Sequence, residues 1–306
     1  MTNTAMACTI QGRMLCASAL AYSIPTSPSV LPALGVSMPQ TPPYYAGAGY
    51  TAPPLMIKNG FGACTLGINV DGIVLAFEGT VPTDDWQWLN DLLVPTELAL
   101  GIDGLVSSGF YGDIKDILDP ILTNLQVLMK NNPGLPLIIT GHSKGASMAP
   151  ITAYSLHANH QITASSLYLF ATPLPGDGTF ATHFNVLFPN TFNYQNFGDI
   201  VPLLPPSHAL CAPLATYAPN ALIKLAIDGM SLYGYTAVGN IYFIQAPFHS
   251  VYPAPVAITP ALANLQLAAA GQLLQTESWT ALGNAHAHNC GYGYMSSICP
   301  EVICPS

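Results

Sequence analysis

Residues 135–149 read LPLIITGHSKGASMA, and this stretch decides the fold class. The short apolar run at 135–140 is typical of a buried strand in a parallel sheet. Small residues from Gly145 onward suit a helix that packs closely on that strand. Between them, GHSKG at 141–145 matches the pattern G-x-S-x-G. The stretch therefore predicts a strand, a sharp turn that exposes a serine, and a helix.

Strands and helices alternate on both sides of this turn. Upstream, residues 63–70 and 73–79 flank Asp71-Gly72 and predict two strands around a tight turn. Residues 114–130 carry Ile and Leu at helical spacing and end at Asn-Asn-Pro-Gly, which breaks a helix. Downstream, the pattern predicts strands over 165–171, 191–197 and 242–245 and a helix over 261–275. This order predicts an α/β protein with a mainly parallel central sheet flanked by helices.

The two ends of the chain look different from the middle. Residues 1–62 combine a predicted helix at 14–21 with a proline-rich stretch at 25–54 that we expect to be extended and irregular. Residues 207–306 are less regular and are expected to embellish the core. Because we find no internal repeat and no strong linker, we expect one domain over residues 1–306.

Composition excludes several classes of protein. Six Lys plus Arg against fifteen Asp plus Glu give a net charge of −9, so the chain has no basic stripe for nucleic acid. A hydrophobic share of 50% excludes disorder as the main state. Mean hydropathy is +0.39, yet polar and small residues interrupt every apolar run before 18 residues, so we expect no transmembrane segment. An apolar or interfacial ligand fits this composition.

Seven cysteines indicate an oxidising compartment. Cys8 and Cys16 lie near one end and Cys299 and Cys304 near the other, so a disulfide could join the two terminal regions. The sequence does not choose the pairing, and the odd number leaves at least one thiol outside an internal pair. We expect a secreted, monomeric protein.

Ser143 is the candidate nucleophile. In a G-x-S-x-G turn the serine points out above the sheet, because glycines two residues away on each side let the backbone approach closely. Such a serine needs a base and an acid, which follow it in the chain. Asp199 comes directly after the predicted strand at 191–197 and is the expected acid, whereas Asp177 in a Pro-Gly-Asp-Gly sequence is expected to be a turn residue.

Six blocks of sequence resemble the class 3 lipase family of fungal triacylglycerol lipase-like α/β hydrolases. They are LAFEGT at 75–80, DWQWLNDLLVP at 85–95, SGFYGDI at 108–114, LIITGHSKGASMA at 137–149, FATPLPGDGTF at 170–180 and NFGDIVPLLPP at 196–206. The resemblance implies an α/β-hydrolase fold and a serine esterase. Glu78 departs from the family, which usually has a basic residue there, and Ser107-Ser108 replaces a step that usually contains histidine.

The resemblance also implies an oxyanion hole and a lid. Thr80 would supply one oxyanion donor and the Lys144 backbone N–H the other; Thr80 could instead simply end a strand. Residues 82–93 correspond to the lid helix, with Trp86, Trp88 and Leu89 as its substrate-contact residues. An ordinary amphipathic helix that faces the core is the alternative.

The base is expected to be His288, which resembles the late histidine of the family, with His249 and His286 as alternatives. His286, His288 and Cys290 also offer metal ligands, but two further well-spaced ligands are missing, so we expect no metal and no cofactor. We expect Ser143 to attack an apolar carboxylic ester, with His288 moving the proton and Asp199 orienting His288. A triacylglycerol lipase is the first hypothesis. The alternatives are a feruloyl esterase or other carboxylesterase, a phospholipase A1, a polyester hydrolase, or an inactive lipid-binding or partner-binding protein on this fold.

Overall fold

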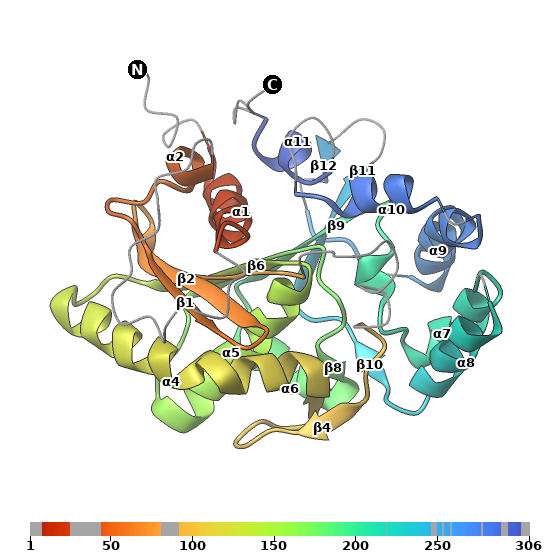
Figure 1. Cartoon of the computed structure of the whole chain (residues 1–306), viewed down its shortest axis with the longest axis horizontal. Helices are drawn as coiled ribbons and strands as arrows, with labels where there is room; N and C mark the ends of the chain where they lie inside the picture. The colour runs from red at the N-terminus through yellow and green to blue at the C-terminus, as the bar shows by residue number, and fades with distance from the viewer. Residues whose placement is uncertain are drawn as a thin grey trace.

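The computed structural model has a mixed eight-stranded sheet at its centre, in the order β1-β2-β3-β6-β7-β9-β11-β12 (Figure 1). It describes residues 8–24, 44–80, 92–218, 220–245, 250–252, 254–257, 259–276, 278–288 and 293–300. The sheet consists of β1 (Leu55–Asn59), β2 (Gly62–Asn69), β3 (Gly72–Phe77), β6 (Leu137–His142), β7 (Ser166–Phe170), β9 (Thr191–Asn196), β11 (Asn240–Gln245) and β12 (Ser250–Val251). Every neighbouring pair from β3 to β11 is parallel, which confirms the expected mainly parallel sheet.

The central strands are the buried apolar runs of the sequence. β3 and β6 are buried along their whole length and pair in parallel, with Leu75 opposite Ile139. β2 and β3 form the predicted antiparallel hairpin. Its turn is held by Asn69, whose side-chain oxygen accepts hydrogen bonds from the N–H groups of Asp71 and Gly72. A local sequence signal therefore determines this connection.

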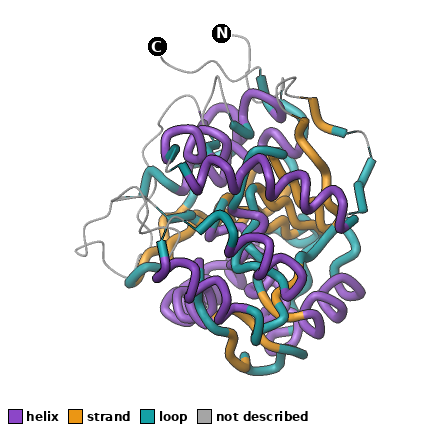
Figure 2. The backbone as a smooth tube through the Cα atoms, turned by 90° about the vertical axis from the view of Figure 1, so that its right-hand side faces the viewer, coloured by secondary structure: helices purple, strands orange, loops and turns teal. Residues whose placement is uncertain are grey.

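Helices cover both faces of the sheet (Figures 1 and 2). α1 (Ile10–Ala21) lies on one face, and α4 (Ser108–Asn131) and α5 (Lys144–His160) lie on the other. Because α5 is packed between the sheet and its neighbours, it is buried from Gly145 through Leu156, as its small side chains allow. This close packing places the start of α5 directly above the end of β6.

α4 begins six residues before the predicted start of 114. The predicted stripe is confirmed, since Ile114, Ile117, Ile121 and Leu125 are buried. Phe110 extends the same buried stripe toward the N-terminus. Two weak helix formers, Gly109 and Gly112, obscure this first turn in the sequence.

A disulfide between Cys8 and Cys299 joins the two terminal regions. It selects one of the pairings that the sequence left open. The predicted helix at 14–21 is confirmed within α1, whose side chains from Met14 to Ala21 are buried against the sheet and against α11 (Met295–Ile298). α1 is therefore fixed at its N-terminal end to the last described segment of the chain.

A smaller sheet and several helices complete the fold. The smaller sheet has the order β10-β8-β5-β4, with β4 (Thr96–Leu98), β5 (Leu105–Ser107), β8 (Gly176–Asp177) and β10 (Tyr235–Thr236). The remaining elements are α2 (Tyr44–Ala48), α6 (Gly178–Leu187), the 3₁₀ helix η2 (Val201–Leu203), α7 (His208–Ala215), α8 (Ala221–Met230), α9 (Pro260–Gln275) and α10 (Trp279–His286). α9 confirms the predicted helix at 261–275. Among the described residues, no helix is both long and apolar enough to cross a bilayer.

One predicted feature at the N-terminal side is wrong where the structure describes it. Residues 25–54 were expected to be irregular throughout, but Tyr44–Ala48 form the short helix α2. The proline-free segment starts directly after Pro43, and a proline is tolerated just at the start of a helix. Residues 25–43 lie outside the described part of the chain.

Candidate active site

Ser143 occupies the predicted sharp turn between β6 and α5. Its backbone has φ 58° and ψ −132°, a strained conformation for a residue with a side chain. Its N–H donates a hydrogen bond to the Phe170 carbonyl at 2.9 Å, which fixes the turn against β7. The turn therefore holds the serine hydroxyl beyond the end of the sheet.

The two glycines of the turn are required by close backbone contacts. A Cβ at Gly141 would lie 2.3 Å from the backbone of Gly145. A Cβ at Gly145 would lie 2.5 Å from the Phe77 carbonyl oxygen. Both distances are too short for any side chain, so the G-x-S-x-G spacing follows from the packing of α5 on β3 and β6.

His286 lies between Ser143 and Asp199. Its Nε2 is 2.8 Å from the Ser143 Oγ, and its Nδ1 is 3.0 Å from Asp199 Oδ2 and 3.2 Å from Oδ1. Because an ionised carboxylate only accepts hydrogen bonds, Nδ1 carries the proton and Nε2 is left to accept the Ser143 hydroxyl proton. This arrangement has the geometry of a serine nucleophile, a base and an orienting acid.

The geometry corrects the expectation for His288. α10 ends at His286, and Ala287 is extended with ψ 148°, so the chain leaves the helix before it reaches His288. The His288 ring instead lies near Tyr22, with centroids 4.6 Å apart, and its burial lowers its pKa to about 4. The alternative His286 takes the place next to Ser143, and His249 lies outside the described residues.

Asp199 is completely buried, and three groups contact its carboxylate. Oδ1 accepts the Val201 N–H at 2.9 Å, and Oδ2 accepts the Tyr294 hydroxyl at 2.9 Å. His286 contacts both oxygens. These three contacts fix the orientation of the carboxylate toward His286.

Tyr294 also connects Asp199 to the strand below it. The Asn196 N–H donates to the Tyr294 hydroxyl at 2.8 Å, so the same hydroxyl accepts from β9 and donates to Asp199. Burial and the neighbouring Asp199 raise the pKa of Tyr294 well above its ordinary value, which keeps the hydroxyl protonated. No local pattern in the sequence points to Tyr294, because its partners Asp199 and Asn196 lie 95 and 98 residues upstream.

His142, the residue before the nucleophile, holds the backbone of His286. Its Nε2 is 2.8 Å from the His286 carbonyl oxygen, and its Nδ1 is 2.8 Å from the Tyr22 hydroxyl. A carbonyl only accepts, so Nε2 carries the proton and Nδ1 accepts from Tyr22. Burial, followed by the nearby His286 and His288, lowers the pKa of His142 well below its ordinary value, so it stays neutral.

A second contact fixes the end of α10. The Asn196 side-chain amide donates to the Ala285 carbonyl at 3.0 Å. With the bond from His142, two consecutive carbonyls at the end of α10 are tied to the central strands. His286 is therefore positioned by side chains of β6 and β9 rather than by its own helix alone.

Thr80 and Lys144, the two predicted oxyanion donors, come after the ends of two paired strands, β3 and β6. Thr80 follows β3, whose end pairs with the end of β6, with Phe77 opposite Gly141. Lys144 is the first residue of α5, where backbone N–H groups are oriented toward the helix N-terminus. Its ammonium group donates to Asp113 at 2.8 Å and to the Phe61 carbonyl at 2.9 Å, so these contacts engage only its side chain.

Glu78 lies next to this region and is buried. Its Oε2 is 3.5 Å from the Lys58 ammonium, while its Oε1 has no hydrogen-bond partner among the described residues. Burial raises the pKa of this carboxyl. Glu78 thus forms a weak internal ion pair with Lys58. The predicted lid residues Trp86, Trp88 and Leu89 lie outside the described part of the chain.

Part of the chain matches a family of known proteins. Residues 74–209 match the family model described as Lipase (class 3). Over this region the chain is therefore similar to the class 3 lipases. The match covers Ser143 and Asp199 but ends at residue 209, at the start of α7, so it does not include the segment that carries His286.

Relatives and solved structures of this family share the α/β-hydrolase fold of the chain. The "Secreted mono- and diacylglycerol lipase A" of Penicillium cyclopium is 28% identical over 177 residues, which cover 55% of this chain and 57% of the relative. "Phospholipase A1-II 7" of Oryza sativa subsp. indica is 30% identical over 44% of this chain and 41% of the relative. The structure of the Rhizomucor miehei lipase propeptide complex has a TM-score of 0.60 at 17% identity and covers 94% of this chain and 81% of that one. The chain thus spans little more than half the length of the first of these curated relatives.

Proposed function

We propose that this protein is a class 3 lipase that hydrolyses carboxylic esters with apolar acyl groups, acylglycerols first among them. The observation that carries the proposal is the contact of His286 with both Ser143 and Asp199. The names of the fungal relatives, which are mono- and diacylglycerol lipases, support acylglycerols as the substrate class.

In the proposed reaction, Ser143 Oγ attacks the ester carbonyl carbon while His286 Nε2 takes the hydroxyl proton. Asp199 holds the resulting imidazolium through Nδ1. Thr80 and the Lys144 N–H stabilise the negative carbonyl oxygen. The tetrahedral intermediate collapses, His286 returns the proton to the departing alcohol, and an acyl-Ser143 ester remains. Water, activated by His286, then releases the carboxylic acid and restores Ser143.

The test replaces Ser143 with alanine. Ser143→Ala is expected to lower kcat/KM on a soluble p-nitrophenyl ester by about 10⁴-fold or more, because the nucleophile is lost. A fluorophosphonate probe should label the wild-type protein and not the variant. Turnover near the wild-type value would contradict the proposal, and an unlabelled wild-type protein would favour an inactive binding protein on this fold.

A phospholipase A1 is the second candidate, because the rice relative that matches this chain carries that name. A panel of dioctanoylglycerol, trioctanoylglycerol and a dioctanoyl phosphatidylcholine separates the two. The acylglycerol hypothesis expects the phospholipid to be the poorest substrate. Faster release of the sn-1 acid from the phospholipid would select the second candidate.

The lid at 82–93 and secretion are part of the same proposal. The relatives named as secreted lipases and the Cys8–Cys299 disulfide support an oxidising compartment. For the lid, activity on a triacylglycerol should rise sharply when the substrate exceeds its solubility limit. A smooth saturation curve through that limit would contradict a lid that opens at an interface.

A further inference from the structure

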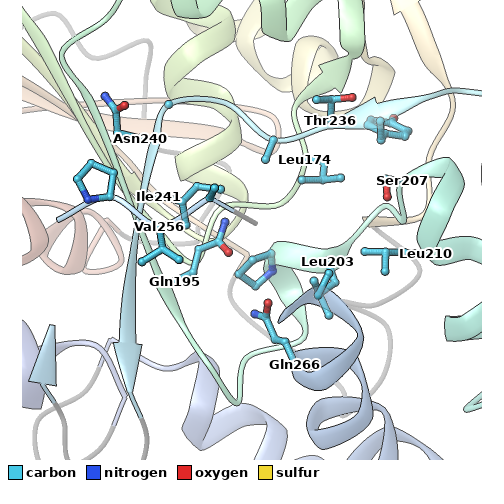
Figure 3. A pocket seen from close by; sticks show the side chains of 17 residues that line it. Leu174, Gln195, Leu203, Ser207, Leu210, Thr236, Asn240, Ile241, Val256 and Gln266 are labelled. Carbon is cyan, nitrogen blue, oxygen red and sulfur yellow. The ribbon is translucent and has the colours of Figure 1, made fainter. Parts of the chain in front are cut away.

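A pocket away from the candidate active site lies among β9, β11, η2, α7 and α9 (Figure 3). Its volume is about 510 Å³, which is within the range of small-molecule sites. Ser143, His286 and Asp199 are not among its lining residues. The pocket is thus separate from the site of ester cleavage.

The walls of the pocket favour a neutral aliphatic ligand. Five leucine, isoleucine and valine side chains line it beside polar ones such as Gln195, Ser207 and Asn240, and no charged side chain is among the described residues that line it. A charged group placed there would lose its hydration without gaining a counter-ion. The apolar contacts are provided by Leu174, Leu203, Leu210, Ile241 and Val256.

One polar side chain at the pocket, Gln266, has an acceptor atom without a hydrogen-bond donor in the described part of the chain. Gln266 of α9 is completely buried, and its Nε2 donates to the Asp199 carbonyl oxygen at 3.4 Å. A carbonyl accepts only, so this contact fixes which end of the amide is nitrogen. The other end, Oε1, is buried and has no partner among the described residues. In Figure 3 this oxygen points toward the other lining side chains.

An unpaired buried acceptor is unfavourable until a donor reaches it. An aliphatic molecule with a hydroxyl group supplies that donor and fills the apolar volume. We propose that this pocket binds such a molecule, with its chain against Leu203, Leu210 and Ile241 and its hydroxyl donating to Gln266 Oε1. Long-chain alcohols and partial acylglycerols share this chemistry.

The same amide links the pocket to the active site. Gln266 holds the backbone of Asp199 while its other end faces the ligand, so a bound hydroxyl fixes both ends of the amide. A ligand that binds only the folded protein stabilises it by mass action. Occupation should therefore raise the melting temperature of the protein without any turnover of the ligand.

The experiment compares 1-octanol with its isomer heptyl methyl ether, which accepts hydrogen bonds but donates none. Binding to the Ser143→Ala protein is measured by calorimetry, so that no hydrolysis enters the result. We expect octanol to bind about 3- to 10-fold more tightly than the ether. In Gln266→Met, which keeps a side chain of similar length without the acceptor, the ratio should fall to about 1.

A second variant keeps the test independent of Gln266. Val256→Trp, on the half-buried loop at the pocket, should fill the volume and remove octanol binding. Equal affinities for octanol and ether in the Ser143→Ala protein, or unchanged octanol binding after Val256→Trp, would overturn the proposal. A 1-monooctanoylglycerol arm distinguishes the source: tighter binding than octanol assigns a partial acylglycerol, and weaker binding assigns a long-chain alcohol. Since hydrolysis is not measured, failure here leaves the proposed function intact.

Discussion

The two halves of the active site are positioned in different ways. Ser143 is fixed by its own turn, where φ 58° and the glycine contacts follow from packing between neighbouring elements of the central sheet. His286 comes from the C-terminal region and is fixed by side chains that reach it from β6 and β9. The nucleophile thus depends on local backbone geometry, and the base depends on a few long-range hydrogen bonds. The two regions should respond differently to substitution.

The largest expected effect is on the turn itself. Gly145→Ala places a Cβ 2.5 Å from the Phe77 carbonyl, so α5 must move away from the sheet. We expect a loss of at least about 3 kcal/mol in the free energy of unfolding, measured by urea denaturation. Gly283→Ala in α10 is the matched control, because its Cβ meets nothing within 4 Å. The control should gain about 0.5–1 kcal/mol, and equal effects of the two changes would contradict this contrast.

The C-terminal region should lose stability in acid through His288. Burial lowers the pKa of His288 to about 4, whereas the unfolded chain titrates near pH ~6.5. Between these values the unfolded state binds more protons than the folded state, so stability falls as the pH falls. At pH 5 this effect of His288 lowers the free energy of unfolding by about 2 kcal/mol relative to its value at neutral pH.

His288→Gln removes that titration and should flatten the dependence of the melting temperature on pH between 7 and 5. The neutral variant keeps a polar side chain of comparable length. A dependence as steep as that of the wild-type protein would show that His288 does not cause the acid sensitivity.

A smaller effect is expected at the link between the two regions. Tyr294→Phe removes the donor to Asp199 and the acceptor for the Asn196 N–H. We expect about 1–2 kcal/mol less stability and a roughly 10-fold lower kcat, with KM little changed, because Asp199 would hold His286 less firmly. Urea denaturation and steady-state kinetics measure both. Unchanged kcat with reduced stability would assign Tyr294 a structural role only.

The sequence predicts features that arise within short segments. The β2–β3 hairpin, β6, the turn at Ser143 and the position of Asp199 after β9 all follow from local patterns. The sequence does not predict the first turn of α4, because glycines obscure it. It does not predict α2 either, because the prolines before it suggest an irregular chain.

The choice of histidine could not be made from the sequence. His286 and His288 are separated by one alanine, and only the end of α10 and its ties to His142 and Asn196 decide which ring reaches Ser143. The partners of Tyr294 and Gln266 were inaccessible for the same reason, because each contact joins segments far apart in the chain. The end of α10 and its tertiary contacts thus determine which histidine reaches Ser143, and residue spacing alone does not.

The central claim is that His286, and not His288, serves Ser143 as its base. The most direct measurement compares kcat/KM of His286→Ala and His288→Ala on p-nitrophenyl butyrate at pH 8, with circular dichroism to show that both variants are folded. We predict a fall of about 10⁴-fold for His286→Ala and of less than 10-fold for His288→Ala. The reverse order, with His288→Ala the inactive variant, would contradict the account.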